Sequence, residues 1–306
     1  MTRAFFIVGP TATGKSEIAA DVAREVGAEI VSADAFQIYR GMDLLTAKPE
    51  APTLAKTSHH LISMVPLTEE MNAEKYRRAA TVAIEEISSR GRLAIVVGGT
   101  GLYIKALTHG LAPLPESDPK LREELNAMSL DDLRSQLSEL DPETARKIDL
   151  KNHRRLVRAL EICLLTGKSA SETVAGVGGW TGSSIPAIGI FVFRDREELY
   201  KRINRRVEAI FERGVIEEVR TAGVMSATAS PMIGLREIHE MLAGKKSLPQ
   251  CITEIQQATR RYAKRQLTWF RRQTNFLPLN LSFLTHNEAV KWISLRILSE
   301  AGTRDD

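Results

Sequence analysis

The sequence of 306 residues predicts an α/β fold, in which a mostly parallel sheet is flanked by helices and carries a small all-helical insertion. Short apolar runs, typical of buried parallel strands, alternate with stretches of helical periodicity. The first apolar run ends in a glycine-rich loop, and proline- and glycine-rich stretches interrupt the alternation in mid-chain. We therefore expect a core made of residues 1–113 and 185–306, with residues 114–184 as the insertion.

The first apolar run, Ala4–Val8, leads directly into the loop, which reads GPTATGKS and is followed by a helical pattern. A loop of this spacing between a strand and a helix turns its backbone N–H groups inward and cradles phosphate at the helix N-terminus. Lys15 supplies a charge for the outer phosphate, and Ser16 supplies a hydroxyl for Mg²⁺. The core is thus of the phosphate-binding-loop type, and the loop predicts a diphosphate or triphosphate ligand. The expected ligand-binding residues are Gly9, Pro10, Thr11, Ala12, Thr13, Gly14, Lys15 and Ser16.

Two more segments are predicted to be strands, and the second of them is a continuous apolar run. Glu29–Ser32 ends at Ala33-Asp34, and Leu93–Val97 runs straight into Gly98-Gly99-Thr100. Ligands of parallel sheets bind beyond the carboxyl ends of the strands. We therefore expect the phosphate-binding loop, Asp34 and the Gly98–Thr100 turn to converge on one crevice.

The remaining core elements follow from pattern alone. The stretch from Asp34 to Pro49 has no strong period and reads as loop, whereas Asn72 to Arg90 is helical by pattern. Strand character returns at Ala187–Phe193, and the pattern after it predicts only helices to the end of the chain.

The insertion is bounded by two expected hinges. Pro113, Pro115 and Pro119 punctuate the first hinge, and the second is the Gly/Ser/Pro-rich stretch 178–186. Between them, residues 121 to about 172 show short helical segments. No internal repeat is apparent.

Two helical segments place basic residues opposite an apolar face. In the first, Ile255, Ala258, Tyr262, Trp269 and Phe270 share one side, and six basic residues lie on the other: Arg260, Arg261, Lys264, Arg265, Arg271 and Arg272. In the insertion, Leu156, Leu160 and Cys163 oppose Arg154, Arg155 and Arg158. Either face alone is typical of a solvated surface, but two of them beside a phosphate site favour a polyanionic partner.

Composition excludes several classes of protein. The hydrophobic content of 43% and the charged content of 26% are ordinary for a globular protein, and the net charge of +4 is modest. Cys163 and Cys251 lack the spacing of a zinc site or a disulfide framework, and the apolar run before Gly9 is too short for a signal peptide or a membrane span. We expect a cytoplasmic protein that does not bind membranes.

The motifs together resemble the tRNA dimethylallyltransferase (isopentenyltransferase) family, of the bacterial type without a C-terminal zinc finger. The resemblance spans nearly the whole chain and rests on residues 9–16 (GPTATGKS), 32–40 (SADAFQIYR), 46–49 (TAKP), 59–62 (HHLI), 98–103 (GGTGLY), 152–161 (NHRRLVRALE) and 259–270 (TRRYAKRQLTWF). One departure is Ile233–Glu237, which reads IGLRE where the family more often has IGYKE, so position 235 receives no role.

The resemblance implies transfer of a dimethylallyl group from dimethylallyl diphosphate to N6 of adenosine 37 in tRNA, with Mg²⁺ as cofactor. The adenine amino group is a poor nucleophile, so the reaction needs a base. By position alone Asp34 is equally well a cap or a Mg²⁺-orienting aspartate, and the resemblance favours the base. Thr100 offers a hydroxyl to the same amino group, although turn chemistry alone also explains a threonine there.

Further residues are assigned by the same resemblance or by position. Arg202 and Arg206, four apart on the helix after the last strand, are candidates to stabilise the departing diphosphate, although such pairs usually face solvent. The resemblance places an extruded base of the anticodon stem-loop against Asp34, Ala35, Phe36 and Gln37. It places the RNA against Arg122, Arg154, Arg155, Leu156, Val157 and Arg158.

Three other functions remain open from the sequence. A small-molecule kinase or NTPase uses the same loop, but its central strand often ends in Asp for Mg²⁺, whereas Leu93–Val97 ends in Gly-Gly-Thr. A prenyltransferase acting on free adenine nucleotides would not need the basic Arg260–Arg272 face. An RNA-binding module without chemistry leaves the phosphate-binding loop unexplained. We expect a monomer.

Overall fold

A computed structural model describes residues 4–111, 114–175 and 185–302. The chain divides into two compact units, one formed by Met1–Thr108 with Ser184–Asp306 and the other by His109–Ser183. The predicted insertion starts at 114, so the second unit begins slightly earlier in the chain than expected. Of the two expected hinges, Pro113 and all but the last two residues of 178–186 lie outside the described residues.

The first unit is built on a six-stranded sheet whose order is β3-β2-β4-β1-β5-β6. Every neighbouring pair is parallel, which confirms the predicted α/β class. The strands are β1 (Ala4–Val8), β2 (Glu29–Ala33), β3 (His59–His60), β4 (Ala94–Gly98), β5 (Ile188–Phe193) and β6 (Phe276–Asn280). The strand that carries the phosphate-binding loop therefore lies between β4 and β5.

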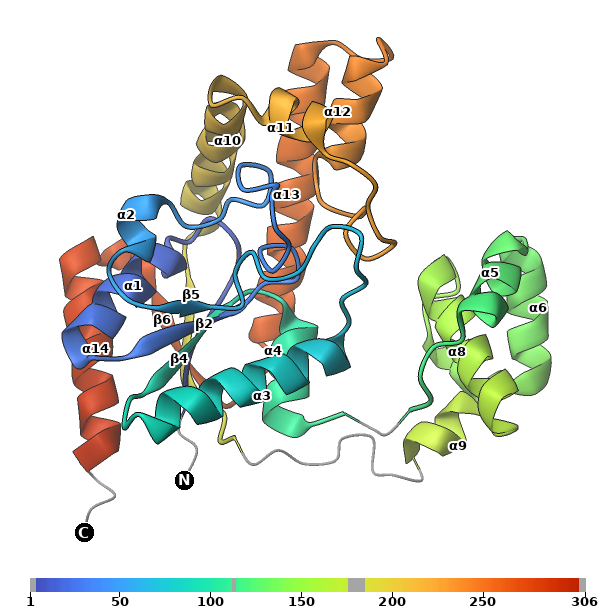
Figure 1. Ribbon diagram of the computed structural model, residues 1–306, viewed down its shortest axis with the longest axis horizontal. Helices are drawn as coiled ribbons and strands as arrows, with labels where there is room; N and C mark the ends of the chain where they lie inside the picture. Colours follow the sequence, from blue (N-terminus) through green and yellow to red (C-terminus); the bar gives the residue numbers. More distant parts are fainter. Residues whose placement is uncertain (1–3, 112–113, 176–184, 303–306) are drawn as a thin grey trace. The chain divides into compact units, whose positions relative to one another are not determined.

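Helices cover both faces of the sheet, as Figure 1 shows. One face packs against α1 (Lys15–Val26) and α14 (His286–Gly302), through residues such as Ile18, Val22 and Ile293. The other face packs against α3 (Ala73–Ser89), α4 (Gly101–His109) and α13 (Leu248–Phe270). The unit also contains α2 (Ala51–Leu54), α10 (Arg196–Glu212), α11 (Val215–Thr221), α12 (Leu235–Leu242) and the 3-10 turn η1 (Leu281–Phe283).

Glycine is required where the strand ends approach one another. A Cβ atom at Gly9 would lie 2.1 Å from the carbonyl oxygen of Val192, and one at Gly98 would lie 2.2 Å from that of Ala33. Any larger residue would push the neighbouring strands apart. Gly9 thus lets the start of the loop after β1 lie against β5, and Gly98 lets the end of β4 lie against β2.

Two of the strands, β3 and β6, were not predicted from the sequence. The prediction of helices alone after Phe193 was wrong, because β6 and η1 lie between α13 and α14. Strand β6 contains Pro278, which cannot donate a ladder hydrogen bond and is tolerated because β6 is an edge strand. Strand β3 has only two residues, too few to leave a pattern.

The second unit is helical, as predicted. It contains α5 (Pro119–Ala127), α6 (Leu130–Leu140), α7 (Pro142–Lys147), α8 (His153–Thr166) and α9 (Ala170–Ala175). Its own core includes Leu133, Leu137, Leu156 and Leu160, all fully buried. Side chains cap several of these helices at their N-termini, among them Asp118 on α5 and Asn152 on α8.

Two exclusions made from composition can be compared with the structure. Cys163 and Cys251 are both buried and unbridged. Among the helices described, none combines the length and the apolar content that crossing a bilayer requires.

Candidate functional site

The loops after β1, β2 and β4 are joined by hydrogen bonds, which confirms that they converge. The N–H of Gly9 donates to the carbonyl of Gly98 over 3.2 Å, and the N–H of Thr100 donates to that of Ala33 over 3.2 Å. The N–H of Ala35 donates to Thr100 Oγ1 over 3.0 Å. The three segments therefore form one rigid floor at the carboxyl edge of the sheet.

Two arginines, one just before α10 and one within it, donate hydrogen bonds to the phosphate-binding loop. Ala12 and Gly14 have φ angles of 64° and 92°, so the backbone turns sharply before α1 begins at Lys15. Arg202 Nε donates to the Ala12 carbonyl and Arg194 Nε donates to the Thr13 carbonyl, each over 2.8 Å. These bonds fix the turn of the loop. The N–H groups of Gly9 and Thr11 already donate to Gly98 and Gln266, so the amides that can bind an anion are those near the start of α1.

A cavity of about 430 Å³ lies beside this loop, and six basic residues line it: Lys15, Lys48, Arg202, Arg205, Arg206 and Arg213. Asp34 lines the same cavity. A concentration of cations at a helix N-terminus suits a diphosphate. Arg202 and Arg206, which position alone assigned weakly, do lie at the phosphate-binding loop.

Burial and neighbouring charges set the protonation of these cations. Desolvation lowers the pKa of Lys15 to about 8, although the negative charge of Asp34 opposes this shift. Burial likewise lowers the pKa of Arg206, and Asp34 again opposes it. A bound diphosphate would place negative charge beside these half-buried cations and favour their protonated forms.

The carboxylate of Asp34 is oriented by the backbone that follows it. Its Oδ1 atom accepts hydrogen bonds from the N–H groups of Phe36, over 3.0 Å, and Gln37, over 3.3 Å. Within the described part of the chain, Oδ2 receives no such bond. Asp34 therefore caps a turn with its Oδ1 atom, and this bonding leaves Oδ2 available for a second role.

A smaller chamber of about 60 Å³ adjoins the cationic cavity, and we call it the apolar chamber because nine of the fifteen residues that line it are apolar. The two share Thr11, Asp34, Leu44, Ala47, Arg206 and Ile210 as lining residues. The remaining wall of the chamber is mostly apolar and includes Leu45, Val207, Met232, Ile233 and Ile255. Asp34 thus lies at the boundary between the cationic cavity and the apolar chamber.

The sequence reasoning missed Gln266, which links α13 to the site. Its Oε1 atom accepts from the N–H of Thr11 over 2.9 Å, and its Nε2 atom donates to the Gly99 carbonyl over 2.8 Å. Tyr262, one turn earlier, lines the apolar chamber, and burial together with the charge of Asp34 raises the pKa of its hydroxyl. Both lie in the TRRYAKRQ stretch, whose predicted role rests only on its basic residues.

The HHLI stretch has a structural role at the opposite end of β2. The buried carboxylate of Glu29 accepts from His60 Nε2 over 2.7 Å and is paired with Arg90 and Arg92. These contacts lower the pKa of Glu29 despite its burial. Glu29 and Asp34 stand at opposite ends of one strand, so this cluster lies outside the site.

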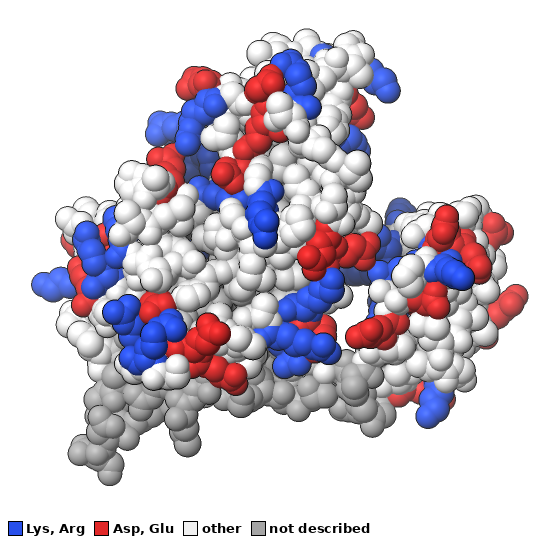
Figure 2. Space-filling model, viewed as in Figure 1, with Lys and Arg blue, Asp and Glu red and all other residues white. Residues whose placement is uncertain are grey.

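The two basic faces differ from the prediction in part. Arg261, Lys264, Arg265, Arg271 and Arg272 are exposed, as expected. Arg260 is not on the solvent face, because its guanidinium donates to Asn204 Oδ1 over 2.8 Å and lies over the Tyr200 ring. The face shown in Figure 2 intersperses basic with acidic side chains among the described residues.

On α8, the prediction holds for some residues and is corrected for others. Leu156, Leu160 and Cys163 form the buried face as predicted, and Arg154 and Arg155 are exposed. The Leu156 and Val157 side chains are buried in the core of the helical unit, so the assignment of these two positions to RNA stays a prediction about their backbone.

Arg122 and Arg158 have an internal partner. Both pair with the fully buried carboxylate of Glu161, and Arg158 also donates to the Pro115 carbonyl. An isolated buried carboxylate is costly, so these two guanidinium groups stabilise the helical unit. Their assignment to RNA stays a prediction.

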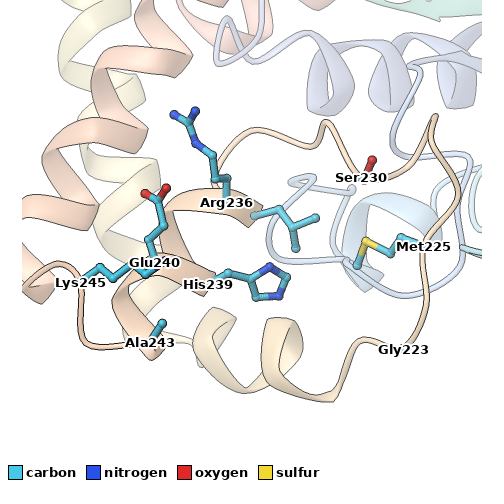
Figure 3. A pocket seen from close by; sticks show the side chains of 9 residues that line it. Gly223, Met225, Ser230, Arg236, His239, Glu240, Ala243 and Lys245 are labelled. Atoms are coloured by element: carbon cyan, nitrogen blue, oxygen red, sulfur yellow. The ribbon is translucent and has the colours of Figure 1, made fainter. Parts of the chain in front are cut away.

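A separate cavity of about 520 Å³ lies along α12 (Figure 3). The His239 ring and the Met225 side chain point toward the same space, whereas the Arg236 guanidinium extends away and pairs with Glu237. Leu235, the position that departs from the family pattern, lines this cavity and is only 4% exposed. The described residues that line it do not include the phosphate-binding loop.

Comparisons with known proteins agree on one family. The family model described as IPP transferase matches residues 37–273. The tRNA dimethylallyltransferase 1 of Citrifermentans bemidjiense is 43% identical over 271 residues, covering 87% of this chain and 88% of that protein. The full-length tRNA isopentenylpyrophosphate transferase of Bacillus halodurans superposes with a TM-score of 0.73 at 34% identity, covering 100% of this chain and 98% of that one. A eukaryotic dimethylallyltransferase acting on tRNA gives a TM-score of 0.80 at 25% identity, covering 97% and 80% respectively.

Proposed function

The chain belongs to the IPP transferase family, and on that premise we propose that it transfers a dimethylallyl group from dimethylallyl diphosphate to N6 of adenosine 37 in tRNA. One observation carries the proposal. Asp34, with one carboxylate oxygen free of backbone hydrogen bonds, lines both the cationic cavity and the apolar chamber. A donor with a charged head and an apolar chain needs both compartments, and its reacting carbon lies where the two meet.

The diphosphate of the donor occupies the cationic cavity. The loop amides, Lys15 and the arginines Arg202 and Arg206 stabilise the negative charge that grows on the leaving group. Ser16 would hold Mg²⁺ together with the diphosphate oxygens, because oxygen ligands suit this ion, and Glu17 and Asp43 line the same cavity. When bound there, Mg²⁺ neutralises diphosphate charge.

The acceptor adenine presents its amino group to Asp34. As the bond from N6 to the allylic carbon forms and the bond from that carbon to the diphosphate oxygen breaks, the Asp34 carboxylate takes the proton that N6 loses. Thr100 Oγ1 accepts the N–H of Ala35, and the Thr100 side chain is also hydrogen-bonded to that of Tyr262, so its hydroxyl must leave Tyr262 to donate to the adenine. The base must leave its stack to reach this point, which is least costly in a single-stranded loop.

A mass-spectrometric assay separates this function from its alternatives. Purified protein, Mg²⁺, dimethylallyl diphosphate and unmodified tRNA are combined, and nucleoside 37 is examined. We expect the dimethylallyl adduct on adenosine 37 and no product when free adenine nucleotides replace tRNA. Rapid ATP hydrolysis or modification of free nucleotides, with tRNA untouched, would support the kinase or the nucleotide prenyltransferase instead.

The exposed arginines of α8 provide the test for tRNA binding. Replacing Arg154 and Arg155 by Ala should weaken tRNA binding and reduce its logarithmic salt slope by about one for each phosphate that the variant no longer neutralises. Donor binding should not change. The matched control replaces Arg146 and Lys147, two exposed basic residues on α7 of the same unit. Equal losses of affinity in both double variants would mean that overall charge, and not this helix face, binds the RNA.

A further inference from the structure

A single carboxylate from α11 holds the loop that separates the two compartments. The N–H of Leu44 donates to Glu218 Oε1 over 2.9 Å, and the N–H of Leu45 donates to Glu218 Oε2 over 2.8 Å. Two successive backbone N–H groups that point at one carboxylate form an anion-binding site in the backbone. Helix α11 itself is anchored by Val215 and Val219, which are 0% and 1% exposed.

The residues held in this way are walls of the site. Leu44 lines both the cationic cavity and the apolar chamber, and Leu45 lines the chamber. A Cβ atom at Gly234 would lie 2.9 Å from Leu45 Cδ1, so the Leu45 side chain packs closely against this backbone. A shift of Leu45 would therefore change the shape of the chamber.

The residues on either side of Leu44 and Leu45 are held by hydrogen bonds within segment 37–48. Glu218, by contrast, binds the two leucine amides from a distant part of the chain. Met42 and Ala47 adopt left-handed φ angles of 55° and 50°, which are unfavourable for residues with a side chain. Lys48 Nζ donates to the Gly41 carbonyl and Gln37 Nε2 donates to the Ala47 carbonyl, so both ends of the strained stretch are tied. Between these ties, the carboxylate of Glu218 binds the two leucine amides.

We propose that Glu218 is a positioning residue for the transfer reaction. It fixes Leu44, which lines both compartments, and Leu45, which lines the apolar chamber, and it thereby sets how the donor is held. This inference rests on the proposed function, because it takes the chamber to hold the prenyl chain. Glu218 acts through the loop and does not touch the reacting atoms.

The test compares Glu218→Ala with Glu217→Ala, an exposed neighbour whose carboxylate pairs with Arg220. Hydrogen exchange at the amides of Leu44 and Leu45 should accelerate in Glu218→Ala alone, with the β4 amides unchanged. The KM for dimethylallyl diphosphate should rise roughly tenfold or more, because the donor is less well held. The KM for tRNA and the kcat at saturating donor should stay within about threefold of wild type. Glu217→Ala should behave as wild type.

Two results would overturn the proposal: unchanged exchange at Leu44 and Leu45, or a fall in kcat with an unaltered donor KM. If Glu218→Ala does not fold, Glu218→Gln keeps one acceptor oxygen, and its exchange and donor KM should shift in the same directions by less. Failure of the proposed function looks different, since wild type and Glu217→Ala would then both transfer no dimethylallyl group while the exchange experiment still reports on the loop.

Discussion

Replacing Asp34 by Asn should lower the rate of transfer to tRNA by about 10²–10⁴-fold, because the variant loses the base that receives the N6 proton. Asn keeps an Oδ1 atom to accept the N–H groups of Phe36 and Gln37, so the turn after β2 is preserved. Single-turnover kinetics with donor and tRNA both saturating measure the effect on the chemical step.

Binding distinguishes loss of the base from damage to the site. Asp34 favours the charged forms of Lys15 and Arg206, and its negative charge opposes that of the donor. Removing the charge should therefore leave the affinity for dimethylallyl diphosphate unchanged or slightly stronger, as calorimetry can measure. A parallel loss of donor affinity and rate in Asp34→Asn would contradict the role of base.

Replacing Lys15 by Ala should weaken donor binding by roughly 10- to 100-fold, because a charge-assisted hydrogen bond to the diphosphate is lost. The rate at saturating donor should also fall by about 10²–10³-fold, since the same charge stabilises the leaving group. Titration with donor and turnover of the variant measure the two effects separately. tRNA affinity is the internal control, and it should not change.

The lowered pKa of Lys15 adds a pH dependence with a defined sign. The ammonium group is charged below its pKa of about 8 and becomes neutral above it, so kcat/KM for the donor should fall as the pH rises through that value. The kcat profile should lack this inflection, because the bound diphosphate raises the pKa of the lysine. In Lys15→Arg, any remaining activity should show no inflection near pH 8. A flat wild-type kcat/KM profile between about pH 7 and 10 would show that the charge of Lys15 does not bind the donor.

The sequence predicts the floor of the site well, because it consists of local motifs at strand ends. The phosphate-binding loop, Asp34 and Thr100 each follow a predicted strand, and the parallel sheet brings the ends of its strands together. Strand β1 has the predicted bounds, and α3 lies within the predicted range with Asn72 as its cap. These features depend on neighbours in sequence, which pattern reasoning can follow.

The walls of the site depend on contacts between segments that are far apart in the sequence, and the sequence did not predict them. Gln266 joins the loops after β1 and β4 across more than 160 positions, and Glu218 binds leucine amides more than 170 positions away. Nothing in the sequence near either residue signals these bonds. A basic helix face likewise cannot reveal that Arg260 bonds to Asn204 of α10.

Charged residues were harder to assign than apolar ones. Leu156 and Arg158 both fall in one predicted motif, yet one is core and the other neutralises a buried glutamate. Helical periodicity separates buried from exposed faces, but it does not show which arginines already have an internal partner. That distinction required Glu161, whose burial the sequence does not signal.

The central claim is that Asp34 meets the acceptor amino group where the charged and apolar compartments of the donor site join. The most direct test is a crystal structure with a non-reactive dimethylallyl diphosphate analogue and an unmodified anticodon stem-loop. We expect the diphosphate within hydrogen-bond distance of Lys15 Nζ, the prenyl chain in the apolar chamber, and Asp34 Oδ2 within hydrogen-bond reach of N6. A diphosphate bound away from Lys15, or an Asp34 carboxylate turned from the adenine, would contradict it.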